Sequence, residues 1–144
     1  MKMKNKRIFL ASDHAGFVLK QKISKFLTSK GINILDLGTK NSSSVDYPDF
    51  AHMLAKKMKT KDSIGILVCG SGIGMSMAAN RHKNIRAALC HNIRSTKLSR
   101  MHNNANVITI GSRLTKKELA LKCVNVFLKT PFDGGRHLRR IKKI

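Results

Sequence analysis

The sequence has no tryptophan, a single tyrosine and only two prolines among its 144 residues. It also has no apolar stretch close to the roughly 20 residues that a membrane-spanning helix needs, so we expect no contact with a membrane. Its three cysteines, Cys69, Cys90 and Cys123, form no CxxC pair and are odd in number. Because disulfide frameworks use paired cysteines, this pattern favours a reduced, cytoplasmic protein.

Acidic residues are scarce, with seven against 29 lysines and arginines and a formal net charge of +22. Such a charge favours polyanions, so a basic nucleic-acid-binding module is one hypothesis. Against it, the lysines are spread along the whole chain and few aromatic side chains are available to stack on bases. We interpret the charge as a solvated lysine surface and expect no nucleic-acid partner. Because Glu118 is the only glutamate, we expect proton transfer to use aspartate, histidine or cysteine.

Short β-rich segments alternate with segments of helical period, without repeats or low-complexity linkers. In the first helical segment Val18, Ile23, Phe26 and Leu27 share one face, and Gly31 follows as a stop signal. This alternation predicts a single α/β domain over residues 1–144 with an open, parallel five-stranded sheet. The expected strands are 7–12, 32–37, 64–69, 85–90 and 106–111, and the expected helices are 15–30, 48–60, 73–83, 93–102 and 115–129.

Residues that can carry chemistry concentrate where the predicted strands end. In open parallel sheets, ligands bind beyond the carboxyl ends of the strands. We therefore expect an active site at this edge of the sheet. The strand ends are Ser12-Asp13-His14, Cys69-Gly70-Ser71-Gly72, Cys90-His91 and Gly111-Ser112-Arg113.

The segment LVCGSGIGMS, residues 67–76, ends a strand in Cys69 and continues with three alternating glycines. Its G-x-G-x-G spacing follows a third strand, and no acid occurs between this loop and Glu118, so it does not match a dinucleotide fingerprint. It also lacks the Gly-Lys-Ser/Thr of a P-loop. Two interpretations stay open for the glycines: a tight strand-to-helix turn and an anion cradle of backbone amides. Cys69 is either a base or nucleophile beside these amides or a buried structural thiol.

Two candidate features lie in the last third of the chain. His102, at the end of a predicted helix, is either a C-cap or a catalyst. In the tail, residues 132–144, Arg136 and Arg140 share a helical face and with Arg113 can clamp a phosphate, unless the tail is a frayed basic end. The apolar residues of the tail recur every third position, which predicts packing against something, such as a second subunit. These residues are Leu138, Ile141 and Ile144.

Six motifs in order resemble the type B ribose-5-phosphate isomerases, a family that includes the galactose-6-phosphate isomerase subunits. They are ASDHAGFVLK, DLGT, DYPDFA, LVCGSGIGMSMAANRHKNIRAALC, LSRMHNNANVITIGSR and FDGGRH. The resemblance implies a Rossmann-like three-layer sandwich with a C-terminal helical tail. It also implies interconversion of ribose 5-phosphate and ribulose 5-phosphate through an enediolate, in the non-oxidative pentose phosphate pathway and without metal or cofactor. Galactose 6-phosphate and allose 6-phosphate are the alternative substrates.

The resemblance also implies a role for each site residue. Cys69 is the expected base, because some relatives use a glutamate at the position of Met75 and methionine cannot take a proton. The amides of Gly70, Gly72 and Gly74, with Ser71, form the expected anion hole. His102 is expected to open the sugar ring near Asp13 and Asn103, and Tyr47 to shape the sugar pocket. The expected phosphate ligands are His14, Arg113, Arg136, His137 and Arg140.

The resemblance further implies a homodimer, or a tetramer built from it, in which each site draws on both subunits. Residues 132–144 are then expected to pack on the partner subunit.

Overall fold

The computed structural model describes residues 6–144, so residues 1–5 of the expected domain lie outside the described part. Strands and helices alternate along the chain and are followed by one additional helix. The strands are β1 (Arg7–Ser12), β2 (Ile34–Asp36), β3 (Ser63–Cys69), β4 (Ala87–Leu89) and β5 (Val107–Gly111). The helices are α1 (Phe17–Ser29), α2 (Tyr47–Lys57), α3 (Ile73–Ala79), α4 (Ile93–Met101), α5 (Lys117–Lys129) and α6 (Arg136–Ile141).

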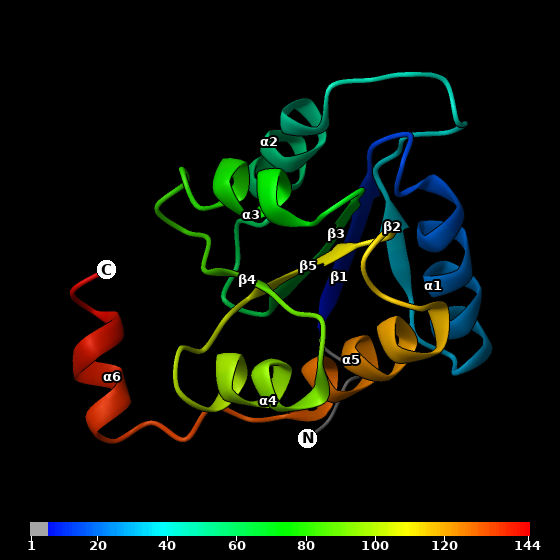
Figure 1. Cartoon of the computed structure of the whole chain (residues 1–144). Helices are drawn as coiled ribbons and strands as arrows, with labels where there is room; N and C mark the ends of the chain where they lie inside the picture. The colour runs from blue at the N-terminus through cyan, green and yellow to red at the C-terminus, as the bar shows by residue number, and fades with distance from the viewer. Residues whose placement is uncertain (1–5) are drawn as a thin grey trace.

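The strands form one parallel sheet in the order β2-β1-β3-β5-β4, with helices on both faces (Figure 1). This confirms the expected single α/β domain with a five-stranded parallel sheet. The register aligns Ser12 with Val68 and Cys69 with Gly111, so β1, β3 and β5 end at nearly the same level. Successive motifs of the sequence therefore meet at one edge of the sheet.

Alternating side chains of the central strands pack into two cores. On one face Ile8, Leu10 and Ile66 pack with apolar residues of α1 and α5, such as Ile23 and Phe127. On the other face Phe9, Ala11 and Leu67 pack with residues of α2 and α3, such as Leu54 and Met75. Because strands buried on both faces have no polar side, β1 and β3 are nearly continuous apolar runs. In the part of the chain described, no helix is both long and apolar enough to cross a membrane.

The edge strands β2 and β4 are shorter than the expected 32–37 and 85–90, because each has a single neighbour in the sheet. Helix α3 also ends earlier, at Ala79 instead of residue 83. There the side chain of Asn80 donates to the carbonyl of Ala87 at 2.9 Å and accepts from the Ala87 amide at 2.7 Å. This pair of hydrogen bonds turns the chain from α3 into β4.

One expectation about the core is wrong. Val18 was expected on the buried face of α1 with Ile23, Phe26 and Leu27, but its side chain is 64% exposed. Ile23 and Leu27 are buried and Phe26 is partly buried against them. Val18 shares the exposed face of α1 with Lys22, four residues further on, and both residues border a surface cavity.

Helix α6 stands apart from the two helical layers, on the β4 side of the molecule (Figure 1). None of its residues is buried; Leu138 is 43% exposed and Ile144, just beyond the helix, is 84% exposed. The tail is therefore helical, as expected, but its apolar residues are not covered by the rest of the chain.

Candidate active site

A cleft of about 580 Å³ opens at the carboxyl ends of β1 and β3. Its polar lining consists of residues that the sequence predicted for the site: Asp13, His14, Tyr47, Cys69, Gly70, Ser71, Gly74 and Arg113. The position agrees with the general rule for open parallel sheets. Four apolar residues of the lining were not predicted: Ala15, Ile73, Met77 and Leu114. Ile73 and Met77 are four residues apart on α3, so helical spacing was the signal that could have found them.

Cys69 is the last residue of β3, and its thiol borders the cleft although the residue is only 4% exposed. The backbone N–H of Gly72 donates a hydrogen bond to Cys69 Sγ at 3.0 Å. This turn requires glycine, because Gly72 has φ of +77° and a Cβ there would lie 2.9 Å from the Gly111 nitrogen. The glycine-rich loop thus wraps around the sulfur and fixes its position at the base of the cleft.

Asp13 and His14 continue the chain from β1 into the cleft. Asp13 is 6% exposed, and its Oδ1 accepts a hydrogen bond from the Gly16 amide at 2.9 Å. His14 Nδ1 accepts from the backbone N–H of Val45 at 3.2 Å. Because Nδ1 is the acceptor in this bond, a neutral His14 carries its proton on Nε2 and offers a donor there.

Arg113 and the end of β5 are joined to the cysteine loop by backbone contacts. The amides of Ser112 and Arg113 donate to the carbonyls of Cys69 at 2.8 Å and Gly70 at 2.9 Å. At Gly111 a Cβ would lie 2.5 Å from the carbonyl carbon of Ser71, so the two loops are in direct backbone contact. The Arg113 guanidinium lies across Gly70, where a Cβ would be 3.1 Å from its Nη1.

Tyr47 closes the opposite side of the cleft from the start of α2. Its ring lies against Gly74, where a Cβ would be 2.5 Å from the ring carbon Cζ. A side chain at position 74 would displace the tyrosine. Met75, the neighbouring residue, points away from the cleft into the core and is fully buried.

The other two thiols are in different surroundings. Cys90 and Cys123 are both buried in the core on the α1 and α5 face, away from the cleft. Burial raises the pKa of each of these thiols above its ordinary value. Among the three cysteines, Cys69 alone borders the cleft, which distinguishes it as the candidate for chemistry.

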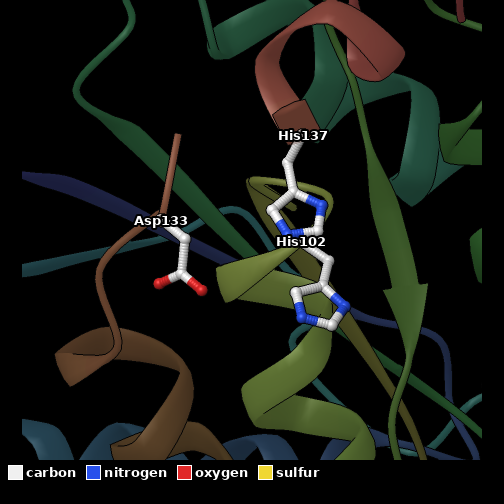
Figure 2. A group of neighbouring side chains, drawn as sticks. All are labelled: His102, Asp133 and His137. Carbon is white, nitrogen blue, oxygen red and sulfur yellow. The ribbon is translucent and has the colours of Figure 1, made fainter. Parts of the chain in front are cut away.

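The remaining predicted residues do not line this cleft: Gly72, which lies in the turn around Cys69 Sγ, and His102, Asn103, Arg136, His137 and Arg140. The His102 and His137 rings instead stack on each other, with centroids 4.3 Å apart and planes inclined by 12° (Figure 2). Arg136 and Arg140 are exposed on α6, and Asn103 borders a separate cavity of about 370 Å³ next to β4. Partial desolvation, followed by the charges of His102, Arg136 and Arg140, lowers the pKa of His137, while Asp133 raises it.

Backbone contacts hold this second group together. His102 ends α4, and its amide donates to the Leu98 carbonyl at 2.9 Å. The Asp133 amide donates to the carbonyl of Met101 at 3.1 Å, which fixes the segment before α6 beside His102. Arg100 strengthens the junction by donating to the Thr130 carbonyl at 3.2 Å. The sequence alone did not indicate Asp133, whose position depends on this tertiary contact.

A parallel α/β sheet with a thiol, an acid, an imidazole and an arginine around a glycine-rich loop defines an enzyme of the α/β class that acts on a small anionic molecule. The family model described as Ribose/Galactose Isomerase matches residues 8–144. This chain therefore belongs to the ribose/galactose isomerase family. Family membership favours the isomerase hypothesis over the nucleic-acid-binding alternative.

Individual relatives agree with this assignment. The chain is 41% identical over 140 residues to ribose-5-phosphate isomerase B of Escherichia coli, which covers 96% of this chain and 94% of that protein. The structure of ribose 5-phosphate isomerase B from Anaplasma phagocytophilum has a TM-score of 0.94 at 47% identity and covers 99% of both chains. The Mycoplasma genitalium enzyme with bound ribulose-5-phosphate has a TM-score of 0.93 at 45% identity, covering 96% of this chain and 93% of that one.

Proposed function

We propose that this protein interconverts ribose 5-phosphate and ribulose 5-phosphate through an enediolate in the cytoplasm. The observation that carries the proposal is the position of Cys69, whose sulfur lies at the base of the cleft within the loop of residues 69–74. In this reaction Cys69 Sγ takes the proton from C2 of the open-chain aldose, and the electron pair forms the C1–C2 double bond while O1 becomes negative. Return of the proton to C1, with transfer of the hydroxyl proton from O2 to O1, gives the ketose.

The developing charge on oxygen is stabilised by Ser71 and by the amides of the loop of residues 70–74, except that of Gly72, which donates to Cys69 Sγ and stabilises the thiolate instead. Each such preorganised donor typically contributes about 10²–10³ in rate, and a positioned base about 10²–10⁴. Because amide donors carry out the stabilisation, we expect the reaction to need no metal and to persist in a chelator. Asp13 and Tyr47 are proposed to orient the sugar within the same cleft.

We propose that a second copy of the chain completes the site. The mouth of the cleft has apolar residues exposed to an unusual degree for a monomer, with Ile73 43%, Met77 66% and Leu114 67% exposed. The proposed ring-opening residue, His102, and the tail arginines lie elsewhere in the same chain. In a homodimer the partner would supply His102 with Asn103, and Arg136, His137 and Arg140 would join His14 and Arg113 around the phosphate. The domain thus spans residues 1–144, and residues 132–144 pack on the partner.

A coupled isomerase assay of wild type beside Cys69→Ala and Cys123→Ala tests this function. Turnover of ribose 5-phosphate should fall about 10²–10⁴-fold in Cys69→Ala, which loses the base. Cys123→Ala, a control thiol in the core, should keep its turnover in the folded fraction. Equal losses in both variants would contradict the role of Cys69. Faster turnover of galactose 6-phosphate or allose 6-phosphate would assign the enzyme to six-carbon sugars instead.

A further inference from the structure

Three side chains outside the cleft form a group with metal-ligand chemistry. His102, Asp133 and His137 each place one donor atom so that all three lie within 4.8 Å of one another. Figure 2 shows the two stacked imidazoles with a ring nitrogen of each on the side of the Asp133 carboxylate. We propose that these residues form a binding site for Zn²⁺ and that zinc at this site inhibits the enzyme. The inhibition, but not the binding, rests on the function proposed above for His102.

The His102 and His137 rings stack nearly parallel, so side-chain rotation must take them out of the stack before both can direct a nitrogen at one ion. Tetrahedral zinc has Zn–N distances of about 2.0–2.1 Å, which places its ligand atoms roughly 3.3 Å apart. The three donors must therefore approach by an ångström or more, which side-chain rotation can supply. Asp133 is exposed, and Gly134 and Gly135 after it both have positive φ. Within the chain no core packing opposes the closure, since α6 has no buried residue. In the proposed dimer, the contact of the tail with the partner must also permit it.

Backbone contacts keep the group together during such a rotation. The Asp133 amide is held by the Met101 carbonyl, and Met101 directly precedes His102. His102 and Asp133 therefore belong to segments that a hydrogen bond already joins, and His137 follows Asp133 by four residues. This preorganisation reduces the conformational entropy that metal binding must overcome.

The donor set selects the metal. Two imidazoles and one carboxylate leave a fourth position open for water, the arrangement found in zinc sites with three protein ligands. Mg²⁺ and Ca²⁺ prefer sets made of oxygen atoms, so they are disfavoured here. The neighbouring arginines 136 and 140 repel every cation, which makes strong imidazole coordination a requirement and restricts the site to metals such as Zn²⁺.

Zinc at this site would remove a proton carrier. A His102 nitrogen bound to the ion has no free electron pair and cannot exchange a proton with the ring oxygen of the sugar. His137, proposed as a phosphate ligand, would be occupied at the same time. Zinc binding and substrate binding are therefore mutually exclusive, and inhibition should be competitive with the sugar phosphate.

Titration calorimetry of the full chain with zinc chloride, in a metal-free buffer that does not chelate, measures the site directly. Wild type should bind one Zn²⁺ per chain, and Asp133→Ala and His137→Ala should each lower the affinity at least about tenfold. His82→Ala is the matched control, because His52 and His82 are another close imidazole pair, with nitrogens 2.7 Å apart. This control should keep the zinc affinity of wild type. A zinc affinity that is unchanged in both Asp133→Ala and His137→Ala, or that is lost in His82→Ala, would contradict the proposed zinc site.

The isomerase assay then separates binding from inhibition. Asp133 has no proposed part in the reaction, so Asp133→Ala should turn over like wild type in a chelator yet resist zinc concentrations that stop wild type. Zinc bound at the cluster without competitive inhibition would overturn the inhibitory role. The protein could also bind zinc at this site and be inactive on every sugar phosphate. That result would support the zinc site but refute the proposed function, and with it the proposed inhibition.

Discussion

Lys20 places an ammonium group in the interior between α1 and β2. The residue is 1% exposed, and its Nζ donates to both carboxylate oxygens of Asp36 at 2.6 and 2.7 Å. The Asp36 side chain is 34% exposed and also accepts the Gly38 amide at 2.9 Å. The two partners are therefore unequal: the carboxylate keeps water and a second donor, whereas the carboxylate is the one counter-charge of the ammonium, whose other neighbour is the Phe17 ring, 5.5 Å from Nζ to the centroid.

Because the two partners differ in burial, replacing each of them should lower the unfolding free energy by a different amount. Asp36→Ala leaves a buried ammonium without a counter-charge and should cost about 3–5 kcal/mol of unfolding free energy. Lys20→Met fills the same space with an apolar side chain and should cost clearly less, since Asp36 remains hydrated. Urea unfolding of both variants and of the double variant measures the difference. A Lys20→Met variant as unstable as Asp36→Ala would contradict the argument.

At the scale of elements, the histidine pair His52–His82 joins α2 to the turn that follows α3. His52 Nδ1 and His82 Nε2 are 2.7 Å apart, with ring centroids separated by 5.0 Å. A hydrogen bond between two imidazoles requires that one of these nitrogens has no proton. The bridge therefore persists while at most one ring is charged and breaks when both are.

Burial, followed by the charges of His52 and Lys56, lowers the pKa of His82 below its ordinary value of 6.5. The unfolded chain then binds the proton more readily than the folded one, so this contribution to stability is present above about pH 6.5 and is lost as the pH falls below it. We expect the unfolding free energy from urea titrations to decrease between pH 7 and 5. His82→Gln should show a smaller decrease over this interval. An identical pH dependence in the variant would assign the loss to other groups.

The central strands could be predicted from the sequence together with their carboxyl ends, and the ends of the outer elements could not. β1 and β3 are apolar runs that end in Asp13-His14 and Cys69-Gly70, so both the strands and the polar residues at their ends were visible. The end of α3 depends on the contact of Asn80 with Ala87, about which local periodicity carries no information. The exposure of Val18 could have been predicted, because it lies five residues before Ile23, a spacing that does not place two residues on one helix face.

The same distinction applies to the site. The loop that begins at Cys69 is contiguous in sequence, so its residues could be recognised together as candidate site residues: Cys69, Gly70, Ser71 and Gly72. By contrast, His102 and Asp133 are brought together by the Asp133–Met101 backbone contact between segments far apart in the chain. The resemblance to a family implies which residues belong to the site, and the folded structure separates them into two groups.

At the scale of the whole molecule, the assembly that we propose follows from two groups of side chains. The cleft group lines the cleft, and the His102 group consists of His102, Asn103, Arg136, His137 and Arg140. The cleft group and the His102 group are proposed to serve one reaction, yet within one chain only the first lines the cleft. In an isologous dimer each chain would give its His102 group to the cleft of the other, which produces two equivalent sites. The formal charge of +22 fits an anionic substrate, because a positive field raises its concentration near both clefts.

A complementation experiment tests the shared sites. Cys69→Ala removes the cleft base and His102→Ala removes the partner's contribution, so each variant alone should be nearly inactive. When the two are co-expressed, half of the dimers are mixed and each mixed dimer has one intact site, which predicts recovery of about a quarter of wild-type turnover. Co-expression of Cys69→Ala with Asp13→Ala is the control, because both changes affect the cleft and no intact site can form. Recovery in neither pair would show that each site is built from a single chain, and recovery in the control would show that Cys69 and Asp13 act from different chains; either result would contradict the proposed arrangement.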